Sequence, residues 1–435
     1  MKRTSTALVA VAALLGAAAC GGDDDTASTE PAPATDGPAV TEAPVVTDAP
    51  VDTEAPTVTD APVATGAPTE PTEPAEPAGD PIQVGIVTSA SGPLQSYGEQ
   101  YLAGLEAGLA WATDGTGAVN GRPIEFVVND DGGDPAAAIT AATDLVGQGV
   151  SIIAGTVVSG VAVQLAEFAS ENDILYISGP AATDAITGVN DNTFRSGRQS
   201  FQDVATAASL VEGDAGKVLV FAQDTEFGAG NVAAVTNVLG SRGMTVDSLL
   251  VPSTESEFTG FADQINQAAP DLVFVAWAGE TSGAMWQALN QQGVFDTAPV
   301  ATGLGDSVTW PFYGEAATGI SFLNHYFPGA PDNEVNDFLV ANADVADLFT
   351  PDGFVAAQMI VQALSEAGPD DVDGMITALE DWTFEAPKGT QTIRASDHAM
   401  IQPMFTVSLV DAGDGTFTAE LIGTLDPEAT APPES

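Results

Sequence analysis

Residues 172–184 read NDILYISGPAATD, an apolar run that stops at a proline and a group of small residues. The run from Ile174 to Ile177 has no charged residue and predicts a buried strand. Two alanines and a threonine follow Pro180, so the chain has little side chain to pack at this point. We infer that some other group approaches the backbone closely here.

The segments on either side of this stretch alternate between two hydrophobic patterns. Apolar runs of strand type occupy 82–91, 122–131, 150–155 and 174–179, with helical patterns between them. A second series of the same kind runs from 217 to 293. Strands that alternate with helices of about 10 to 15 residues predict βαβ units and parallel sheets. The sequence therefore predicts an α/β fold with two doubly wound parallel-sheet lobes.

Charge and cysteine content limit the possible functions. The chain has 435 residues, with 9 Lys and Arg against 61 Asp and Glu, a formal net charge of −52, and one cysteine. Phosphate binding requires clustered basic side chains, so nucleic acid is excluded as a partner. Such acidity keeps a protein soluble at high salt and favours a saline habitat, and a single cysteine forms no internal disulfide.

The first twenty residues, MKRTSTALVAVAALLGAAAC, have the organisation of an export signal. Lys2 and Arg3 form a basic start, and the apolar run after them is too short to span a bilayer. Small residues precede Cys20, so the segment resembles a bacterial lipoprotein signal in which Cys20 is lipidated. An ordinary secretion signal with an incidental cysteine is the alternative. Lipidation predicts a protein anchored on the outer face of the cell membrane.

Residues 21–80 are predicted to form a disordered tether. Prolines recur at a six-residue period from Pro44 to Pro68, acidic residues are frequent, and Lys, Arg and aromatic residues are absent. Such a segment buries too little apolar surface to offset its ordering entropy. As a flexible coil of about 60 residues it would span roughly 45 Å. We also expect a disordered tail over 425–435.

The carboxyl ends of the predicted strands give a candidate site, because open α/β sheets bind ligands at that edge. These loops are rich in Gly, Ser, Thr and Ala, and contain no Lys, Arg or His. They carry no nucleophile with a base, no phosphate loop and no Cys/His cluster, so we expect neither an enzyme nor a metal or cofactor site. The loops are 89–98, 129–135, 155–160, 178–184, 222–228, 276–281 and 302–307.

The loop 178–184 predicts a carboxylate site. Ala181, Ala182 and Thr183 lie where a strand passes into a helix, and a helix N-terminus offers free N–H groups to an anion. Ser159 and Gly160, at the end of the preceding strand, add a hydroxyl and another N–H. The alternative is a tight helix start with Thr183 as its cap.

Four stretches together resemble the periplasmic leucine/isoleucine/valine-binding proteins of branched-chain amino-acid ABC transporters. They are VGIVTSASGPLQSYGEQYLAGLEAGL, NDDGGDPAAAITAATDLV, ILYISGPAATD and APKGTQTIRASDHAMIQPMFTV. The resemblance covers about 82–424 and implies a two-lobed clamshell with three crossovers, within a solute-binding domain over 81–424. One lobe would hold 82–202 and 330–400, and the other 203–329 and 401–424.

The resemblance also implies roles for individual residues. In the family, the ligand carboxylate is bound by residues that match Ser159, Ala181, Ala182 and Thr183. This assignment coincides with the carboxylate site expected from the strand ends.

Aromatic and acidic residues complete the implied site. Tyr97 and Phe227 match aromatic residues of the family that line the ligand, and Trp277 adds bulk beside them. The acid that takes a ligand ammonium group falls near Asp306, with Glu280 as the alternative.

Two departures leave the ligand open. The family disulfide would join positions near Gly133 and Val158, which are not cysteines here, and Phe227 lacks a tyrosine hydroxyl. Members of the family also bind amides, urea and aromatic acids. We therefore expect an extracytoplasmic solute-binding lipoprotein that delivers an amino acid or related carboxylate to an ABC permease. The alternative is a membrane-tethered sensing ectodomain for amides or small organic acids.

Overall fold

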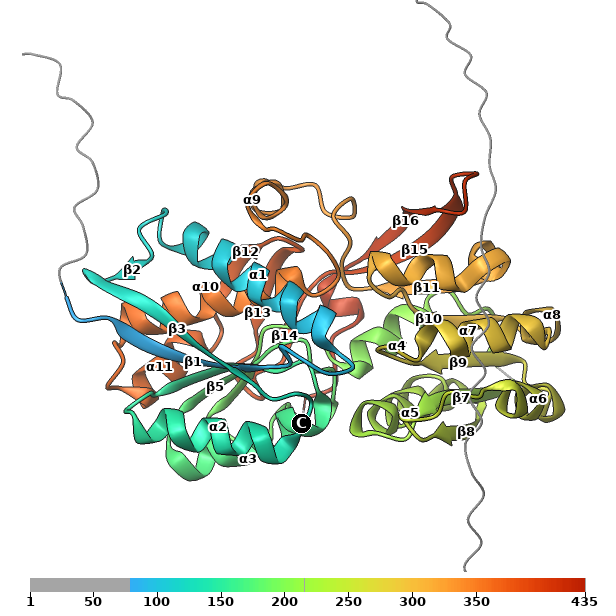
Figure 1. The fold of residues 1–435 in the computed structure, drawn as a ribbon, viewed down its shortest axis with the longest axis horizontal. Helices are drawn as coiled ribbons and strands as arrows, with labels where there is room; N and C mark the ends of the chain where they lie inside the picture. The colour runs from blue at the N-terminus through green and yellow to red at the C-terminus, as the bar shows by residue number, and fades with distance from the viewer. Residues whose placement is uncertain (1–78, 215, 435) are drawn as a thin grey trace, which may run out of the picture. The chain divides into compact units, whose positions relative to one another are not determined.

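The first lobe is built on a six-stranded sheet. The computed structural model describes residues 79–214 and 216–434, which form two lobes (Figure 1). The strand order of the first sheet is β2-β3-β1-β4-β5-β6, parallel except for the β2–β3 pair. Its strands are β1 (Ile82–Thr88), β2 (Ala118–Val119), β3 (Arg122–Asp130), β4 (Ile152–Gly155), β5 (Leu175–Ser178) and β6 (Thr193–Arg195).

The second lobe is built on a seven-stranded sheet in the order β16-β15-β11-β10-β9-β7-β8. Five neighbouring strands are parallel, and β15 and β16 add an antiparallel edge. The strands are β7 (Lys217–Gln223), β8 (Thr245–Val251), β9 (Leu272–Ala276), β10 (Val300–Gly303), β11 (Ser321–Asn324), β15 (Met404–Asp411) and β16 (Phe417–Leu425).

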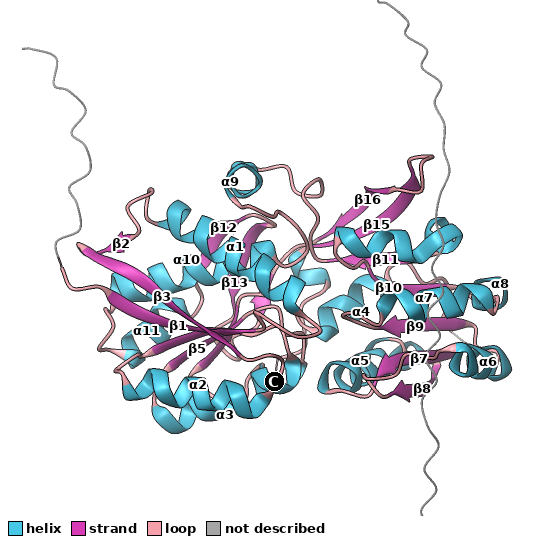
Figure 2. Ribbon diagram, in the orientation of Figure 1, coloured by secondary structure: helices cyan, strands magenta, loops and turns pink. Residues whose placement is uncertain are grey.

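Helices cover both faces of each sheet, as Figure 2 shows. The first lobe has α1 (Gln95–Ala112), α2 (Pro135–Gly147), α3 (Ser159–Asn172), α9 (Glu334–Asn342), α10 (Thr350–Glu366), α11 (Val372–Leu379) and a small sheet of β12 (Thr383–Ala386), β13 (Gly389–Ile393) and β14 (Met400–Ile401). The second lobe has α4 (Ser200–Ala208), α5 (Glu226–Val238), α6 (Thr259–Ala268), α7 (Ser282–Gln291) and α8 (Val294–Thr297). Short 3-10 helices are η1 (Asp184–Ile186), η2 (Gly240–Arg242), η3 (Ser307–Gly319) and η4 (Pro427–Ala429). The predicted doubly wound fold is therefore confirmed.

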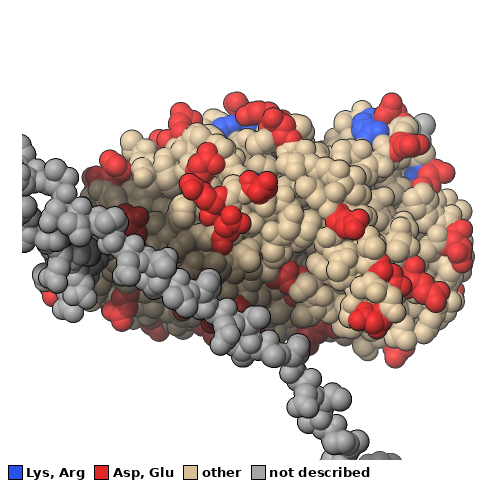
Figure 3. All heavy atoms as spheres, turned by 90° about the horizontal axis from the view of Figure 1, so that it is seen from above, with Lys and Arg blue, Asp and Glu red and all other residues tan. Residues whose placement is uncertain are grey.

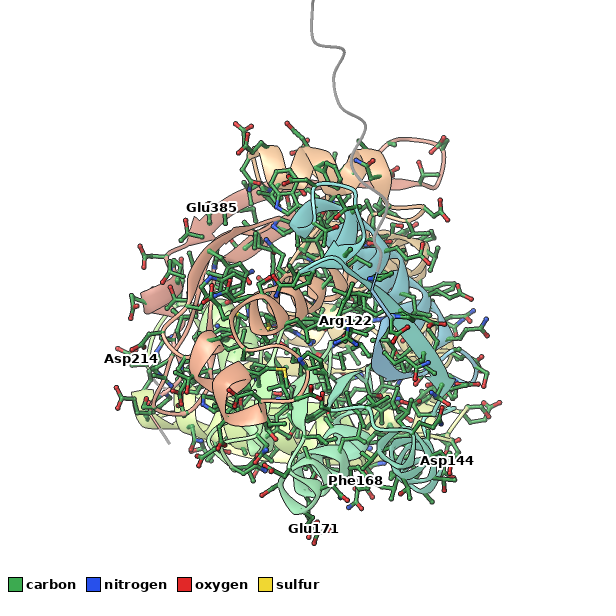
Figure 4. All side chains as sticks on the ribbon, turned by 90° about the vertical axis from the view of Figure 1, so that its left-hand side faces the viewer. Arg122, Asp144, Phe168, Glu171, Asp214 and Glu385 are labelled. Carbon is green, nitrogen blue, oxygen red and sulfur yellow. The ribbon has the colours of Figure 1, made fainter. Side chains whose placement is uncertain are left out.

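The apolar strands explain this layering, because successive side chains point to opposite faces of a sheet. Ile86 packs beneath α1 and α10, whereas the next residue, Val87, packs against α2 and α3. Outside these cores the helices carry acids, and Asp144 of α2 and Glu171 of α3 point away from the sheet (Figure 4). Figure 3 shows acidic side chains spread over one face of the molecule, with few basic ones among them.

Helix α10 returns from far along the chain to complete the first lobe against α1. The two backbones touch at glycines: a Cβ on Gly104 would overlap the carbonyl oxygen of Thr350, and one on Gly353 would overlap that of Tyr101. Only glycine permits this approach. The contact fixes where the loop before α10 enters the space between the lobes.

Three internal segments cross between the lobes, at 196–199, 325–333 and 402–403, and the segment after β16 returns from the second lobe to the first. The predicted boundary between 202 and 203 falls inside α4, which packs on the second sheet. The predicted export signal and most of the predicted tether lie outside the described residues. Within the described residues, no helix has both the length and the apolar character needed to cross a bilayer.

The prediction of a disordered tail is wrong for residues 425–434. Leu425 belongs to β16, and Thr430 has no exposed surface. The Arg394 side chain of the first lobe donates to the carbonyl oxygens of Pro432 at 2.8 Å and Pro433 at 3.4 Å. Proline restricts the backbone and a guanidinium supplies several donors, so this segment is ordered despite its loop-like composition. It runs from the second lobe back onto the first.

We expect Arg394→Ala to release this terminal segment. Hydrogen bonds to a charged group contribute about 1.5–3 kcal/mol each, so the amides of 427–434 should exchange at least about tenfold faster. Hydrogen–deuterium exchange by mass spectrometry measures this effect. The control is Lys217→Ala, which removes a half-exposed pair with Asp247 from the second lobe. Equal exchange in wild type and Arg394→Ala would show that Arg394 does not hold the segment.

Candidate functional site

A cleft of about 560 Å³ lies between the two lobes, at the carboxyl ends of the parallel strands. Both lobes contribute walls, mainly through the loops at the carboxyl ends of the strands. These are the loops selected by the strand-end rule, that open α/β sheets bind ligands at this edge. Seven of the predicted site residues line it: Tyr97, Ser159, Gly160, Ala182, Phe227, Trp277 and Glu280. Ala181, Thr183 and Asp306 are not part of this lining.

The N-terminus of α3 forms the polar part of the first-lobe wall. Ser159 and Gly160 are its first two residues, so their N–H groups have no partner within the helix. Ser159 is buried, with 4% of its surface exposed, and its hydroxyl has no hydrogen-bond partner among the described residues. This end of α3 can therefore donate hydrogen bonds to an anion in the cleft.

Buried arginines are the groups that approach the backbone of the loop 178–184. Arg198 donates to the carbonyl oxygen of Pro180 and Arg195 to that of Thr183, both at 2.6 Å. The Ser200 amide donates to the carbonyl oxygen of Ala182 at 2.7 Å. The small side chains thus make room for the first crossover and its arginines.

Thr183 and Ala181 have structural positions. The Thr183 hydroxyl accepts from the Ala185 amide at 3.1 Å, as a helix cap, and donates to Glu226 at 3.1 Å. Ala181 is fully buried in the core beneath α3. The structure therefore brings Ser159, Gly160 and Ala182 to the cleft, without the Thr183 hydroxyl.

Aromatic rings form much of the rest of the cleft. On the first-lobe side, Tyr97 meets Phe349 edge to face, with ring centroids 4.6 Å apart. On the second-lobe side, Phe227 and Trp277 line the wall, and the Trp277 ring is held by a 3.0 Å hydrogen bond to Thr281. These rings offer an apolar surface to a ligand.

Asp306 contacts the other lobe outside the cleft. Its Oδ2 accepts from Ser96 at 3.2 Å and Gln100 at 3.3 Å, both on α1. Its Oδ1 is buried without a hydrogen-bond partner among the described residues. Burial, reinforced by the nearby Asp347 carboxylate, raises the pKa of Asp306 to about 6. Asp306 thus joins the lobes where an ammonium site was expected.

Sequence reasoning missed several residues on the floor of the cleft. Arg198 faces Asp203 at 3.3 Å, and its guanidinium carbon lies 5.4 Å from the centre of the Phe349 ring. Burial raises the pKa of Asp203 to about 6 despite this partner. His325 also lines the floor, and burial lowers the pKa of its imidazole well below the usual range, so the ring is neutral.

Local signals would have found only some of these residues. His325 directly follows β11, so the strand-end rule would include it once that strand is recognised. Phe349 lies in a loop that returns from α9 to α10 and carries no such signal. Arg198 pairs with the Asp203 carboxylate, whereas the guanidinium of Arg195 donates to the carbonyl oxygens of Thr183 and Arg198.

Comparison with known proteins agrees with this architecture. The model of the family described as periplasmic binding protein matches residues 81–414. A Leu/Ile/Val-binding protein, BraC3, from Rhizobium johnstonii is 25% identical over 308 residues, which cover 69% of this chain and 83% of that protein. A leucine-, isoleucine-, valine-, threonine- and alanine-binding protein from Pseudomonas aeruginosa is 24% identical, with 72% of this chain and 85% of that protein covered.

Solved structures share the fold. An ABC-type branched-chain amino acid transporter from Rhodopseudomonas palustris has a TM-score of 0.69 and 29% identity, with 81% of this chain and 99% of that chain covered. A solute-binding protein of an ABC transporter from the same species, in complex with 4-hydroxybenzoate, has a TM-score of 0.73 and 22% identity, with 80% and 97% covered. The chain belongs to the periplasmic binding protein family, whose members act outside the cytoplasm.

We expect protonation of Asp306 to raise the free energy of unfolding as the pH falls from 7 to 5, whereas the buried, neutral His325 contributes in the opposite direction. The native pKa of Asp306, about 6, lies above the ordinary value, so the folded chain binds this proton more tightly than the unfolded chain. That stability is present below the ordinary pKa and is lost as the pH rises through about 6. The contribution between pH 7 and pH 5 is about 1 kcal/mol.

Asp306→Asn should remove this contribution to the free energy of unfolding. The similar pH-dependent contribution of Asp203 should remain. Urea unfolding at both pH values measures it, with Glu315→Gln as a control that removes an exposed charge from the same lobe. An undiminished pH dependence in Asp306→Asn would contradict the assignment.

Proposed function

We propose that this protein captures a small carboxylate-bearing ligand, an amino acid or a related compound, and delivers it to the permease of an ABC importer. The observation that carries the proposal is the N-terminus of α3, which presents the unpartnered Ser159 hydroxyl and two free N–H groups to the cleft between the lobes.

The remainder of the cleft supports a ligand with an apolar body. Tyr97 and Phe349 from the first lobe and Phe227 and Trp277 from the second lie around the same space. A carboxylate bound at α3 would leave the rest of the ligand among these rings.

The relatives support a ligand that carries a carboxylate, but they do not favour one particular compound. The names of the curated relatives refer to leucine, isoleucine and valine, and one structural neighbour is in complex with 4-hydroxybenzoate. A carboxylate is common to all of these compounds. Solute-binding proteins of ABC transporters are not enzymes, and we propose binding and delivery as the function here.

Closure of the lobes around the ligand would provide the signal for the permease. Neither wall of the cleft encloses a ligand alone, and the lobes are joined by three crossovers that can act as hinges. Ligand contacts to both walls would favour the closed arrangement.

We further propose that Cys20 is lipidated and that residues 21–80 tether the binding domain to the outer face of the cell membrane. The small residues before Cys20 and the acidic, proline-rich composition after it support this arrangement.

We expect Ser159→Ala to weaken ligand binding by roughly 10- to 150-fold, because a hydrogen bond to a charged group contributes about 1.5–3 kcal/mol. A thermal-shift screen of amino acids, amides and carboxylic acids supplies the ligand, and calorimetric titration measures its affinity. Ser253→Ala, which removes a hydroxyl from the opposite wall, is the matched control. If Ser159→Ala binds that ligand as tightly as wild type, α3 does not hold its carboxylate.

We expect Cys20→Ser to move the protein from the membrane fraction into the medium, since the thiol is the attachment point of the lipid. Immunoblots of fractionated cells measure the distribution of wild type and variant. Equal membrane association of the two proteins would exclude lipidation at Cys20.

A further inference from the structure

Glu226 is an acidic residue of the cleft that lies in the strand-end loop 222–228 but that the resemblance did not single out. It is the first residue of α5 in the second lobe, and its side chain reaches across to the first lobe. Its Oε1 accepts from the Thr183 hydroxyl at 3.1 Å. A Cβ placed on Gly160 would lie 3.9 Å from the Cβ of Glu226. Glu226 therefore lies directly against the N-terminus of α3.

The charges that line the cleft are unbalanced. Among the described lining residues, the basic side chain is Arg198 and the acidic ones are Asp203, Glu226 and Glu280. Arg198 is already engaged, because it faces Asp203 at 3.3 Å and donates to the carbonyl oxygen of Pro180 at 2.6 Å. Glu226 and Glu280 thus have no basic side chain opposite them, and the cleft disfavours a ligand that brings only negative charge.

We propose that Glu226 accepts the ammonium group of an α-amino acid whose carboxylate is bound by Ser159 and Gly160, and that it discriminates against carboxylates without this group. The inference rests on the function proposed above. Since the single hydroxyl proton of Thr183 is donated to Glu226, Thr183 orients this acid and is not a donor to the ligand carboxylate.

The geometry explains why Glu226, and not the two acids expected from the sequence, has this role. The two head groups of an α-amino acid sit on one carbon atom, so their partners must lie close together, as Gly160 and Glu226 do. Asp306 lies outside the cleft lining and accepts from α1. Glu280 also lines the cleft but is exposed, and the side chain within 4 Å of the Cβ position on Gly160 is that of Glu226, not Glu280. A ligand held in this way contacts the first lobe by its carboxylate and the second by its ammonium.

The test compares amino acids with their deaminated analogues. Calorimetric titration measures binding of L-leucine against 4-methylpentanoate and of L-phenylalanine against 3-phenylpropanoate, for wild type, Glu226→Gln and Glu280→Gln. The amide oxygen introduced by Glu226→Gln can still accept from Thr183, so the contact between the lobes is kept. We expect Glu226→Gln to weaken amino-acid binding by about 10- to 100-fold while the analogues bind equally or more tightly. Glu280→Gln tests the alternative acid of the cleft, and Glu315→Gln, at an exposed position outside the cleft lining, is the control that should change amino-acid binding by less than about threefold.

Each other outcome overturns the assignment in a distinguishable way. Amino-acid binding that survives Glu226→Gln, or that is lost in Glu280→Gln instead, rejects Glu226 while the proposed function stands. Tighter binding of the analogues than of the amino acids by wild type rejects the ammonium site and leaves a carboxylate carrier. Binding of none of the four compounds by wild type rejects both the amino-acid ligand and the role of Glu226.

Discussion

Two buried arginines fix the backbone on which the cleft is built. Arg195 and Arg198 each donate a 2.6 Å hydrogen bond to a carbonyl oxygen of the loop after β5, at Thr183 and Pro180. Burial lowers the pKa of Arg195 to about 10, so it stays charged at neutral pH. A buried charge without a partner costs several kcal/mol. Movement of this loop would leave the guanidinium groups without their carbonyl acceptors and would therefore be strongly unfavourable. Glu226, Ser200 and the start of α4 are positioned against the same loop.

A second buried ion pair extends this charged layer between the lobes. Lys388 lies 3.2 Å from Asp352, and both side chains are fully buried. The first crossover passes directly over this pair, since a Cβ on Gly197 would lie 2.7 Å from an Asp352 carboxylate oxygen. A chain with only 9 basic residues thus places three of them, Lys388, Arg195 and Arg198, around its hinge. Paired charges favour one arrangement of the crossovers over loosely packed alternatives.

Hydrogen bonds join the two lobes, with hydroxyl donors on the first lobe and carboxylate acceptors on the second. Thr183 and Ser96 of the first lobe donate to Glu226 and Asp306 of the second. The ligand proposed here would join the same pattern, with the first lobe binding its carboxylate and the second its ammonium. Binding and closure are then one event, because the contacts on each wall are completed only when the lobes approach.

The two sheets and part of the cleft can be predicted from the amino-acid sequence alone. Alternating apolar runs predict βαβ units from local periodicity. The strand-end rule then correctly predicts that Tyr97, Ser159, Phe227 and Trp277 lie at one cleft. The tertiary structure was needed to show that Thr183 and Asp306 are not part of the cleft lining, whereas Glu226, Phe349 and His325 are. It was also needed to show that the terminal segment, which resembles a loop in composition, packs onto Arg394. These outcomes depend on which donor reaches which carbonyl or carboxylate across the lobes, and periodicity along the chain does not encode such long-range pairings.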